Sequence, residues 1–334
     1  AGVLGSPARS RWPEDDGSVC LITGGTGGIG RATADGLART RRCGTLYVTG
    51  RSAGSSASAA ASLAAATGHP AVFGLHLNLA SLADVRRFAA TFARLGRRLD
   101  LLILNAGSFG PESGLLTTDG YEQTFQVCHL GHYLLFTLLA PFLGAAPRPL
   151  VVSVSSYSHY DFLKEGWGSD ADWEALRQPL VYSLSAGKVG MHEYGVAKLA
   201  QLLFHGQLRR RANGTATDGA VPSGLLSRAV HPGMVGTHMY ASNIPYPFNK
   251  FIMQGMLTPE EGSRTTLYAA LAPPDADVDC GSHYFDECSC RQPSHEAQSD
   301  ALQQRMWRFS QEAVAKFTAP LPTGRATVAQ CEPR

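Results

Sequence analysis

A glycine-rich turn between an apolar segment and a helical segment places the strongest limit on how this chain can fold. The apolar segment Val19–Thr23 runs into the turn, which reads Thr-Gly-Gly-Thr-Gly-Gly-Ile-Gly and occupies residues 23–30. Gly24 allows a tight turn, and the lack of a side chain at Gly28 lets the backbone approach a phosphate group. The helix expected from Ile29 to Thr40 presents free N–H groups and the positive end of its dipole to such an anion. The turn therefore predicts a nucleotide-binding strand–turn–helix unit.

Strands and helices alternate along the rest of the chain. Further strands are expected at residues 46–49, 72–77, 101–104, 150–154, 225–230 and 281–285. Helices are expected at residues 53–66, 82–95, 119–143, 194–211 and 300–317, and another is expected to start at Thr258, where Thr-Pro-Glu-Glu is typical of a capping box. Such alternation indicates βαβ units with right-handed crossovers. We expect one α/β domain, a Rossmann-type doubly wound parallel sheet of about seven strands with helices on both faces.

The domain is expected to cover residues 18–317, between tails at 1–17 and 318–334. The Gly, Pro and polar composition of both tails predicts fraying unless something holds them. Long loops at 157–187 and 233–257 follow the fifth and sixth strands. Because ligands bind at the carboxyl edge of such sheets, we expect these loops to form the walls of a substrate pocket.

Aromatic side chains in the second of these loops, at Tyr240, Tyr246 and Phe248, fit either a cap over an apolar substrate or plain lid packing.

Composition excludes several classes of protein. The chain has 334 residues, a net charge of +2 and 44% hydrophobic residues, which is typical of a globular protein and does not indicate nucleic-acid binding. The longest nearly unbroken apolar stretch, Leu134–Leu143, is too short to cross a bilayer, so no transmembrane segment is expected. Several arginines and few acids before Trp12 would fit the remnant of an organellar, mitochondrial leader, which leaves the compartment open.

The seven cysteines are scattered and odd in number, which favours a reducing compartment over a disulfide framework. Cys280, His283, Cys288 and Cys290 lie close together in sequence. The pair Cys288-Ser-Cys290 spans too little backbone for the usual zinc chelate, so no metal site is expected.

The end of the second strand indicates which dinucleotide would bind. The segment Gly50-Arg51-Ser52 stands where an acidic residue would accept the ribose 2′-OH of NAD, and no acid is near. A guanidinium at Arg51 can pair with the 2′-phosphate of NADP. The sequence favours NADP(H), with a solvated surface arginine as the alternative.

A tyrosine and a lysine four positions apart suggest proton transfer. Tyr194 and Lys198 share one face of a predicted helix, and an ammonium so close favours the tyrosinate, which lowers the pKa of the phenol toward the range of a general acid/base. Ser155 and Ser156 end the preceding strand at the same edge of the sheet, where a hydroxyl can orient a substrate carbonyl.

These motifs together resemble the short-chain dehydrogenase/reductases, in particular their retinol-dehydrogenase-like branch. The resemblance covers about Val19 to Phe317. It consists of the turn at residues 23–30, Asn78-Leu79-Ala80-Ser81, Asn105-Ala106-Gly107, the helix with Gly120-Tyr121-Glu122 and residues 129–133, Val154-Ser155-Ser156, the Tyr194–Lys198 pair and the segment 231–237.

The resemblance implies a role for each matching position. Tyr194 would be the general acid for carbonyl reduction, Lys198 would hold the nicotinamide ribose, and Ser156 would hydrogen-bond the substrate oxygen. Asn78 would contact adenine in place of the usual aspartate. Cofactor contacts are implied for Gly24, Gly28, Ile29, Gly30, Arg51, Asn78, Asn105, Ala106, Gly107, Tyr194, Lys198, Pro232, Gly233, Val235 and Thr237.

One position departs from the family. Cys128 stands where the family usually has an asparagine that supports a water relay to the lysine. A thiol is a weak hydrogen-bonder and cannot replace both functions of an amide. Either the relay tolerates the loss, or turnover has been reduced or abandoned.

Two functions follow from the sequence. The first is an NADP(H)-dependent oxidoreductase that interconverts a carbonyl and an alcohol on an apolar substrate of the retinoid, steroid or lipid aldehyde type. The second is a catalytically weak or inactive accessory subunit of a larger assembly, such as an organellar membrane complex. A homo-oligomer is also expected, with apolar faces at Leu134, Leu135, Phe136, Leu138, Leu139, Leu199, Leu202, Leu203 and Phe204, which core burial would explain equally well.

Overall fold

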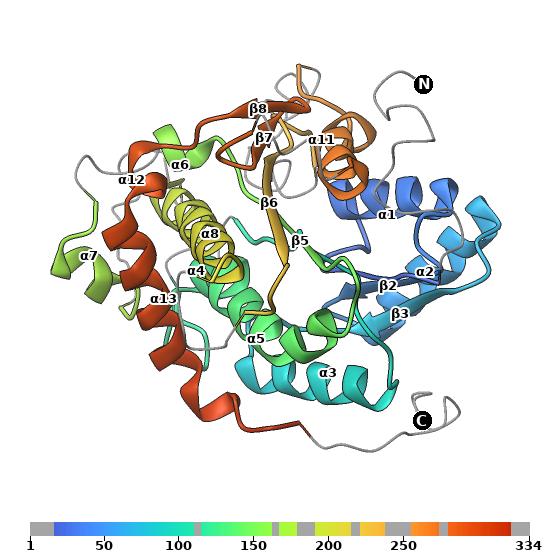
Figure 1. Ribbon diagram of the computed structural model, residues 1–334, viewed down its shortest axis with the longest axis horizontal. Coiled ribbons are helices and arrows are strands. Elements are labelled where there is room, and N and C mark those ends of the chain that lie inside the picture. Colours follow the sequence, from blue (N-terminus) through green and yellow to red (C-terminus); the bar gives the residue numbers. More distant parts are fainter. Residues whose placement is uncertain are drawn as a thin grey trace.

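Eight strands form one sheet in the order β3-β2-β1-β4-β5-β6-β7-β8 (Figure 1). The computed structural model describes residues 17–109, 115–161, 167–178, 191–214, 221–237, 255–273 and 280–321. The strands are β1 (Val19–Ile22), β2 (Thr45–Gly50), β3 (Val72–His76), β4 (Leu101–Leu104), β5 (Leu150–Val154), β6 (Leu226–His231), β7 (Tyr284–Asp286) and β8 (Ser289–Arg291). All neighbours pair in parallel except β7 and β8, which pair antiparallel. The predicted doubly wound parallel sheet is confirmed, and β8 adds one antiparallel edge strand.

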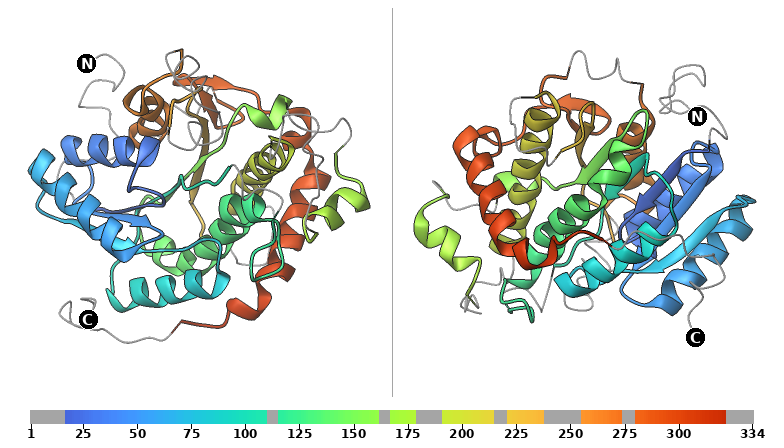
Figure 2. Two further views of the ribbon diagram at one scale, coloured as in Figure 1. Left: turned by 180° about the vertical axis from the view of Figure 1, so that it is seen from behind. Right: turned by 60° about the horizontal axis from the view of Figure 1, so that its bottom comes forward.

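Helices cover both faces of this sheet (Figures 1 and 2). The longer ones are α1 (Gly28–Thr40), α2 (Ala53–Thr67), α3 (Leu82–Arg94), α5 (Gly131–Gly144), α8 (Met191–Ala212), α11 (Pro259–Leu271) and α13 (Asp300–Val314). The shorter ones are α4 (Gln123–Phe125), the π-helical turn η2 (Gln126–Leu130), α6 (Ser158–Asp161), α7 (Asp170–Ala175), α12 (His295–Gln298) and the 3-10 turn η5 (Ala315–Phe317). The cluster on one face joins α1, α2 and α11 to the sheet, and the cluster on the other face joins α3, α5, α8 and α13.

The strands supply both clusters because successive side chains point to opposite faces of a sheet. In β1, Val19 and Leu21 pack with α3 and α5, whereas Cys20 and Ile22 pack with α1 and α11. All four are at most 2% exposed. A strand that is buried on both faces appears as a continuous apolar run, which is the pattern that predicted it.

Helix starts agree with the local chemistry of their caps. The Thr258 side chain accepts from the Glu261 backbone N–H, and the Glu261 side chain bonds back to the Thr258 backbone, with Pro259 at the first turn. This confirms the predicted capping box. Ser52 and Ser81 cap α2 and α3 through their hydroxyls.

The helix from Gln123 to Gly144 is long and apolar enough to cross a membrane by length and composition, which the sequence did not predict. Its most apolar window is 72% buried inside the protein. Contacts with α3 and α8 account for its apolar character without a membrane.

The C-terminal helix α13 covers the outer side of α8 and η2. Trp307 is 2% exposed and stacks on Phe204 with a centroid distance of 6.0 Å. It also meets Tyr133 edge-on at 5.2 Å, and His129 hydrogen-bonds to Ser310 at 2.7 Å. The nine apolar side chains that the sequence offered as an oligomer face are all buried within this single chain.

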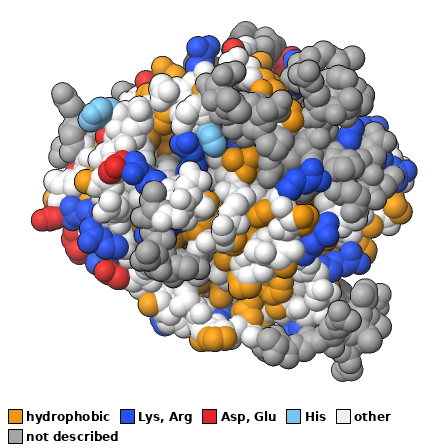
Figure 3. All heavy atoms as spheres, viewed as in Figure 1, with side chains coloured by type: hydrophobic (Ala, Val, Ile, Leu, Met, Phe, Trp, Pro, Cys, Tyr) orange, Lys and Arg blue, Asp and Glu red, His pale blue; other side chains and the backbone are white. Residues whose placement is uncertain are grey.

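Acidic and basic side chains lie beside one another on the surface of α7 and α13 (Figure 3). Arg305 on α13 pairs there with Asp170 on α7. Within the predicted insert 157–187, Trp167 and Trp173 are buried, and Trp173 lies 5.7 Å from Phe309 between ring centroids. Residues 167–178 of the predicted loop 157–187 therefore pack on α13, whereas α6 at the start of that loop contacts α8.

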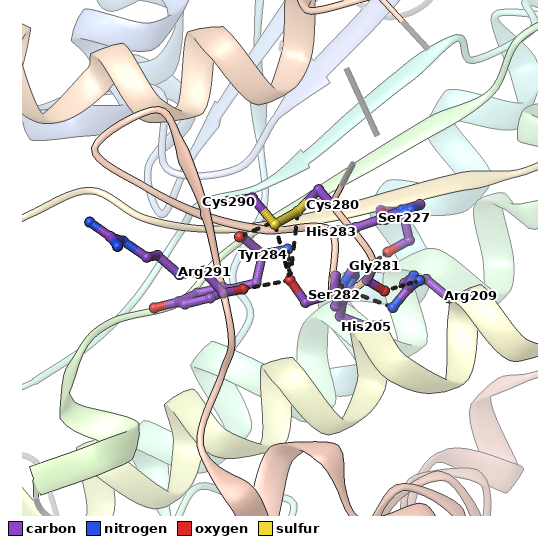
Figure 4. The surroundings of a disulfide bond; sticks show 10 residues. All are labelled: His205, Arg209, Ser227, Cys280, Gly281, Ser282, His283, Tyr284, Cys290 and Arg291. Carbon is purple, nitrogen blue, oxygen red and sulfur yellow. Dashed lines mark hydrogen bonds between the residues drawn. A yellow bond between two sulfur atoms is a disulfide. The ribbon is translucent and has the colours of Figure 1, made fainter. Parts of the chain in front are cut away.

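The expectation of free thiols is wrong for four cysteines. Disulfides join Cys20 to Cys43 and Cys280 to Cys290, so cysteine usage no longer argues for a reducing compartment. The second bond closes the β7–β8 hairpin (Figure 4). Within the described ranges, no three His, Cys, Asp or Glu side chains are grouped as metal ligands.

This hairpin is fastened to α8 by polar contacts. His205 bonds to the Ser227 hydroxyl at 2.8 Å and to the Ser282 carbonyl at 3.1 Å, and Arg209 donates to the Gly281 and Ser282 carbonyls (Figure 4). The helix that carries Tyr194 and Lys198 is therefore attached at its far end to the edge of the sheet.

Candidate active site

The glycine turn leaves no room for side chains at Gly24, Gly25 and Gly30. A Cβ on Gly30 would lie 2.3 Å from the Gly24 oxygen and 2.4 Å from Asn105 Nδ2. A Cβ on Gly24 would lie 3.0 Å from the Ala106 Cα, and its φ of +68° also disfavours a side chain. At Gly28, with φ of +52°, the described atoms within 4 Å of a Cβ belong to Thr237. The turn therefore packs against the end of β4 through backbone, as a close phosphate approach requires.

Thr23 and Asn105 hold the turn in this position. The Thr23 hydroxyl oxygen accepts from the backbone N–H groups of Asn105 and Ala106, both at 3.0 Å. Asn105 Nδ2 donates in return to the Thr23 carbonyl at 2.8 Å. His132 Nε2 lies 2.9 Å from the same Thr23 hydroxyl, so η2–α5 is joined to the turn. Asn105 thus acts first as a brace between β1 and β4.

A cavity of about 410 Å³ lies at the carboxyl edge of the sheet, between the turn and α8. It brings together thirteen of the predicted site residues, namely Gly24, Gly28, Ile29, Gly30, Arg51, Asn78, Asn105, Ala106, Gly107, Tyr194, Lys198, Pro232 and Thr237. Its lining also includes Thr26, Gly27, Thr49, Gly50, Leu77, Leu79, Val127, Val154 and Ser155, which were not among the predicted site residues. Four predicted residues, Cys128, Ser156, Gly233 and Val235, are absent from the lining.

The residues present fit a dinucleotide. Thr237 Oγ1 is buried without a hydrogen-bond partner in the part of the chain that is described. The methyl group of Thr237 would lie 3.3 Å from a Cβ on Gly28. The unpaired Thr237 hydroxyl is therefore on the segment that faces the glycine turn. Arg51 is exposed at the end of β2 and lines the same cavity.

Asn78 is partly committed to local bonds. Its side-chain oxygen accepts from the Ala80 N–H at 3.1 Å, and its backbone N–H donates to Asp84 at 2.7 Å. A carbonyl oxygen has two lone pairs, so Asn78 Oδ1 keeps one for a ligand.

The other wall carries a buried ammonium. Lys198 on α8 is 3% exposed, and its Nζ donates to the Val154 carbonyl and to Gln201 Oε1, both at 2.9 Å. The Nζ lies 5.3 Å from the centroid of the Tyr194 ring, as the four-residue spacing predicts. Burial lowers the pKa of Lys198 from its usual range.

The titratable groups around Lys198 are neutral. Burial raises the pKa of the Cys128 thiol. Burial lowers the pKa of His132 to about 3, and it also lowers the pKa of His231. A Cβ on Gly107 would touch both Cys128 Sγ at 3.6 Å and Lys198 Nζ at 3.7 Å. Cys128 thus lies beside the lysine although it does not line the cavity.

Ser155 and Ser156 make different hydrogen bonds. The Ser155 hydroxyl donates to the Lys198 carbonyl at 3.0 Å, which ties β5 to α8. The Ser156 hydroxyl accepts from Ser158 at 2.7 Å, and Ser156 is 8% exposed. One serine is structural, and the other keeps its own O–H to donate.

Of the cofactor contacts predicted in segment 231–237, only some lie at the cavity. Pro232 and Thr237 line the cavity. Gly233 has a φ of +84°, and Val235 is 1% exposed against Gly262 on α11, so these two shape the segment. Residues 238–254, with Tyr240, Tyr246 and Phe248, lie outside the described residues.

Sequence reasoning missed three polar residues that hold the site. Thr23 was treated as the end of a strand, Ser155 as the first of a pair, and Gln201 was not considered. A signal existed for each: the hydroxyls follow buried strands at the carboxyl edge, and Gln201 is three positions beyond Lys198 on one helix face.

Comparisons with known proteins agree with this geometry. A family-level profile described as short chain dehydrogenase matches residues 18–162. Polyprenol dehydrogenase of Mus musculus is 36% identical over 88% of this chain and 83% of its own length. Retinol dehydrogenase 13 of Homo sapiens is 31% identical over 95% of this chain and 91% of its own length.

Solved structures share the fold at lower identity. A short-chain dehydrogenase from Sphingobium yanoikuyae in complex with NADPH has a TM-score of 0.57 and 20% identity, and the match covers 93% of this chain and 99% of that one. The NADPH-bound carbonyl reductase from chicken fatty liver has a TM-score of 0.56 at 20% identity, over 83% of this chain and 100% of that one. The chain therefore belongs to the short-chain dehydrogenase/reductase family, in the branch that contains the retinol dehydrogenases.

Proposed function

We propose that this protein is an NADP(H)-dependent oxidoreductase that interconverts a carbonyl and an alcohol on an apolar substrate, with Tyr194 as general acid/base. One observation carries the proposal. A single cavity is lined on one side by the glycine turn and on the other by Tyr194 and Lys198. A hydride donor held by the turn would therefore lie beside a phenol that can supply the proton.

The chain's own residues would act in fixed roles. A nicotinamide dinucleotide bound in the cavity supplies or accepts the hydride. Ser156 would donate a hydrogen bond to the substrate oxygen and orient the carbonyl. Tyr194 would give its phenolic proton to that oxygen during reduction and take it back during oxidation. Lys198, a cation 5.3 Å from the ring centroid, would stabilise the tyrosinate that this leaves.

The choice of NADP(H) rests on Arg51. Its guanidinium is exposed at the rim of the cavity, and no acidic side chain lines the cavity among the described residues. A carboxylate there would repel a 2′-phosphate, whereas a guanidinium can bind it through two parallel hydrogen bonds. Two structural neighbours carry NADPH in their descriptions, which is consistent with this choice.

An apolar substrate is supported by the exposed residues beyond the cavity. Tyr157, Met234 and Leu257 are 48%, 65% and 37% exposed. In sequence, Tyr157 follows β5, Met234 follows β6 and Leu257 precedes α11. The Leu257 backbone N–H donates to the Met234 carbonyl. The loops 157–187 and 233–257 are the proposed substrate walls within a domain of residues 18–317. Relatives are described as polyprenol and retinol dehydrogenases.

The test is turnover of a broad panel of aldehydes and ketones with NADPH by the native protein and by Tyr194→Phe. We expect the variant to lose about 100- to 10,000-fold in kcat, the usual contribution of a general acid, while it keeps NADPH affinity. Equal rates in both proteins would refute the assigned chemistry.

The second candidate, a weakly catalytic accessory subunit, is favoured by Cys128. Its thiol is fully buried, and its hydrogen-bond contact among the described residues is a long one of 3.8 Å with the Ser108 carbonyl. Tight NADPH binding without turnover of any panel member would select this candidate. Homo-oligomerisation would need a surface other than the faces of α5 and α8, because those side chains are buried within the chain.

A further inference from the structure

Lys198 donates one of its hydrogen bonds to Gln201, a side chain that was not among the predicted site residues. Gln201 lies one helical turn further along α8 and is 2% exposed. Its Oε1 accepts from Lys198 Nζ at 2.9 Å, and the Val154 carbonyl accepts a second bond of equal length. An ammonium has three donors, so one remains for a ligand in the cavity that Lys198 lines.

The same amide leaves its other end unpaired. Gln201 Nε2 is buried without a hydrogen-bond partner in the described chain. A buried N–H that makes no bond destabilises the folded state, and an apolar side chain of similar size would avoid that cost. The nitrogen end of the side chain therefore gives no reason for an amide here. The oxygen of Gln201 is the part of the side chain with a partner.

Among the described residues, Gln201 is the side chain that accepts a hydrogen bond from Lys198 Nζ. The titratable groups that act on it are Cys128 from η2, His132 from α5, His231 from β6 and Tyr194 from its own helix. A protonated thiol is a weak acceptor, and the neutral histidines are engaged elsewhere, His132 with Thr23 and Cys128, and His231 with the Tyr157 N–H.

We propose that Gln201 is a positioning residue for Lys198, whose ammonium it fixes beside Tyr194 and keeps charged in a buried site. Lys198 thus has its polar side-chain partner on its own helix. Because it does not depend on a polar side chain at position 128, that position can be a thiol. This inference rests on the proposed function, since Lys198 and Tyr194 are its chemical centre. Removal of the Gln201 oxygen should weaken the charge on Lys198 and so make the Tyr194 phenol harder to ionise.

The test compares Gln201→Met and Gln201→Leu with Gln207→Met. Gln207 lies on the same helix, is 3% exposed and accepts from Arg211 Nε at 3.1 Å, away from the cavity. The first readout uses protein without cofactor: the ultraviolet titration of tyrosinate, each protein minus its Tyr194→Phe counterpart. We expect the Gln201 variants to move the Tyr194 midpoint upward by about 1 pH unit, and Gln207→Met to leave it unchanged.

Thermal unfolding and turnover complete the test. The Gln201 variants should unfold at no lower temperature than Gln207→Met, and their kcat should fall about 10- to 100-fold with KM changed less than about threefold. A native Tyr194 midpoint in the Gln201 variants, or an equal shift in Gln207→Met, would overturn the proposal. Absence of turnover in the native protein would count against the proposed oxidoreductase only, because the titration still reports on Gln201.

Discussion

The two walls of the cavity differ in which atoms line them: one is mainly backbone, and the other is mainly titratable side chains. The wall toward β1 and β4 is backbone: glycines at positions 24 and 30, with Thr23 and Asn105 as braces. The wall toward α8 is made of side chains that titrate, with Lys198 buried among neutral groups. Substitutions on the first wall should therefore act through space and change affinity. Substitutions on the second should act through charge and change rate and pH dependence.

The largest effect is expected at Gly30, the tightest position of the backbone wall. An alanine methyl would lie 2.3 Å from the Gly24 oxygen, and backbone cannot give way as a side chain can. Gly30→Ala should weaken NADPH binding by about 100-fold or more and lower the unfolding temperature. Fluorescence titration and thermal unfolding measure both.

The matched control is Gly54→Ala, an exposed position on α2 outside the cavity. Among the described residues, a Cβ there meets Ser52 Oγ at an ordinary contact distance of 3.9 Å, and Gly54 does not have a positive φ. Its affinity should stay within about threefold of native. If both variants bind NADPH equally well, the turn is not the phosphate cradle and the contrast between the walls fails.

A smaller effect is expected at Arg51, a charged side chain on the same side of the cavity as the glycine turn. Arg51→Asp should weaken NADPH by about 10- to 100-fold, because a paired charge is replaced by a repelling one, and should leave NADH binding within about threefold. Arg39→Gln, an exposed α1 residue outside the cavity, is the control. Equal losses for NADPH and NADH would show that Arg51 does not contact the 2′-phosphate.

The backbone wall was also the easier one to predict from the sequence. The turn, β1 and α1 follow from residues adjacent in the chain, and the predicted helix start at Ile29 differs from the observed Gly28 by one position. The predicted strand 225–230 is observed as Leu226–His231. Apolar runs bounded by glycine carry this information locally, so most of the sheet could be predicted.

What the sequence did not reveal depends on contacts between distant residues. Arg228 is fully buried within β6, where its guanidinium donates to carbonyls at the end of α11, a cap that no local pattern indicates. The β7–β8 hairpin turns at Glu287 and Cys288, which have positive φ but are not usual turn residues. The π-helical turn η2 adds one residue to a helical turn. The apolar periodicity of the sequence instead predicts one continuous α-helix there.

The far end of α8, the helix that carries the side-chain wall, predicts a loss of stability in acid. His205 on α8 is buried, and burial lowers its pKa from 6.5 to about 3. Between these two values the unfolded chain binds a proton that the folded chain does not, so stability falls as the pH falls below about 6.5 and is unaffected above it. Each such histidine contributes a slope of about 1.4 kcal/mol per pH unit.

His205→Gln should remove one such slope, because an amide can bond to Ser227 and Ser282 without titrating. Urea unfolding at several pH values between about 4 and about 7 measures it. His295→Gln changes an exposed residue and serves as the control. An unchanged slope in His205→Gln would mean that this histidine is charged in the folded protein, contrary to its burial.

The smallest effect is expected at Cys128, which is beside Lys198 but outside the lining of the cavity. Burial raises the pKa of its thiol, so it stays protonated and unreactive at neutral pH. Cys128→Ser keeps the shape of the side chain and can donate to the Ser108 carbonyl that the thiol meets at 3.8 Å. We expect kcat to change by less than about fivefold, the value of one neutral hydrogen bond, as steady-state assays with NADPH can show. A loss of tenfold or more would give the thiol a direct role next to the lysine. In that case position 128, together with Gln201, would have to be counted among the groups that set the charge of the side-chain wall.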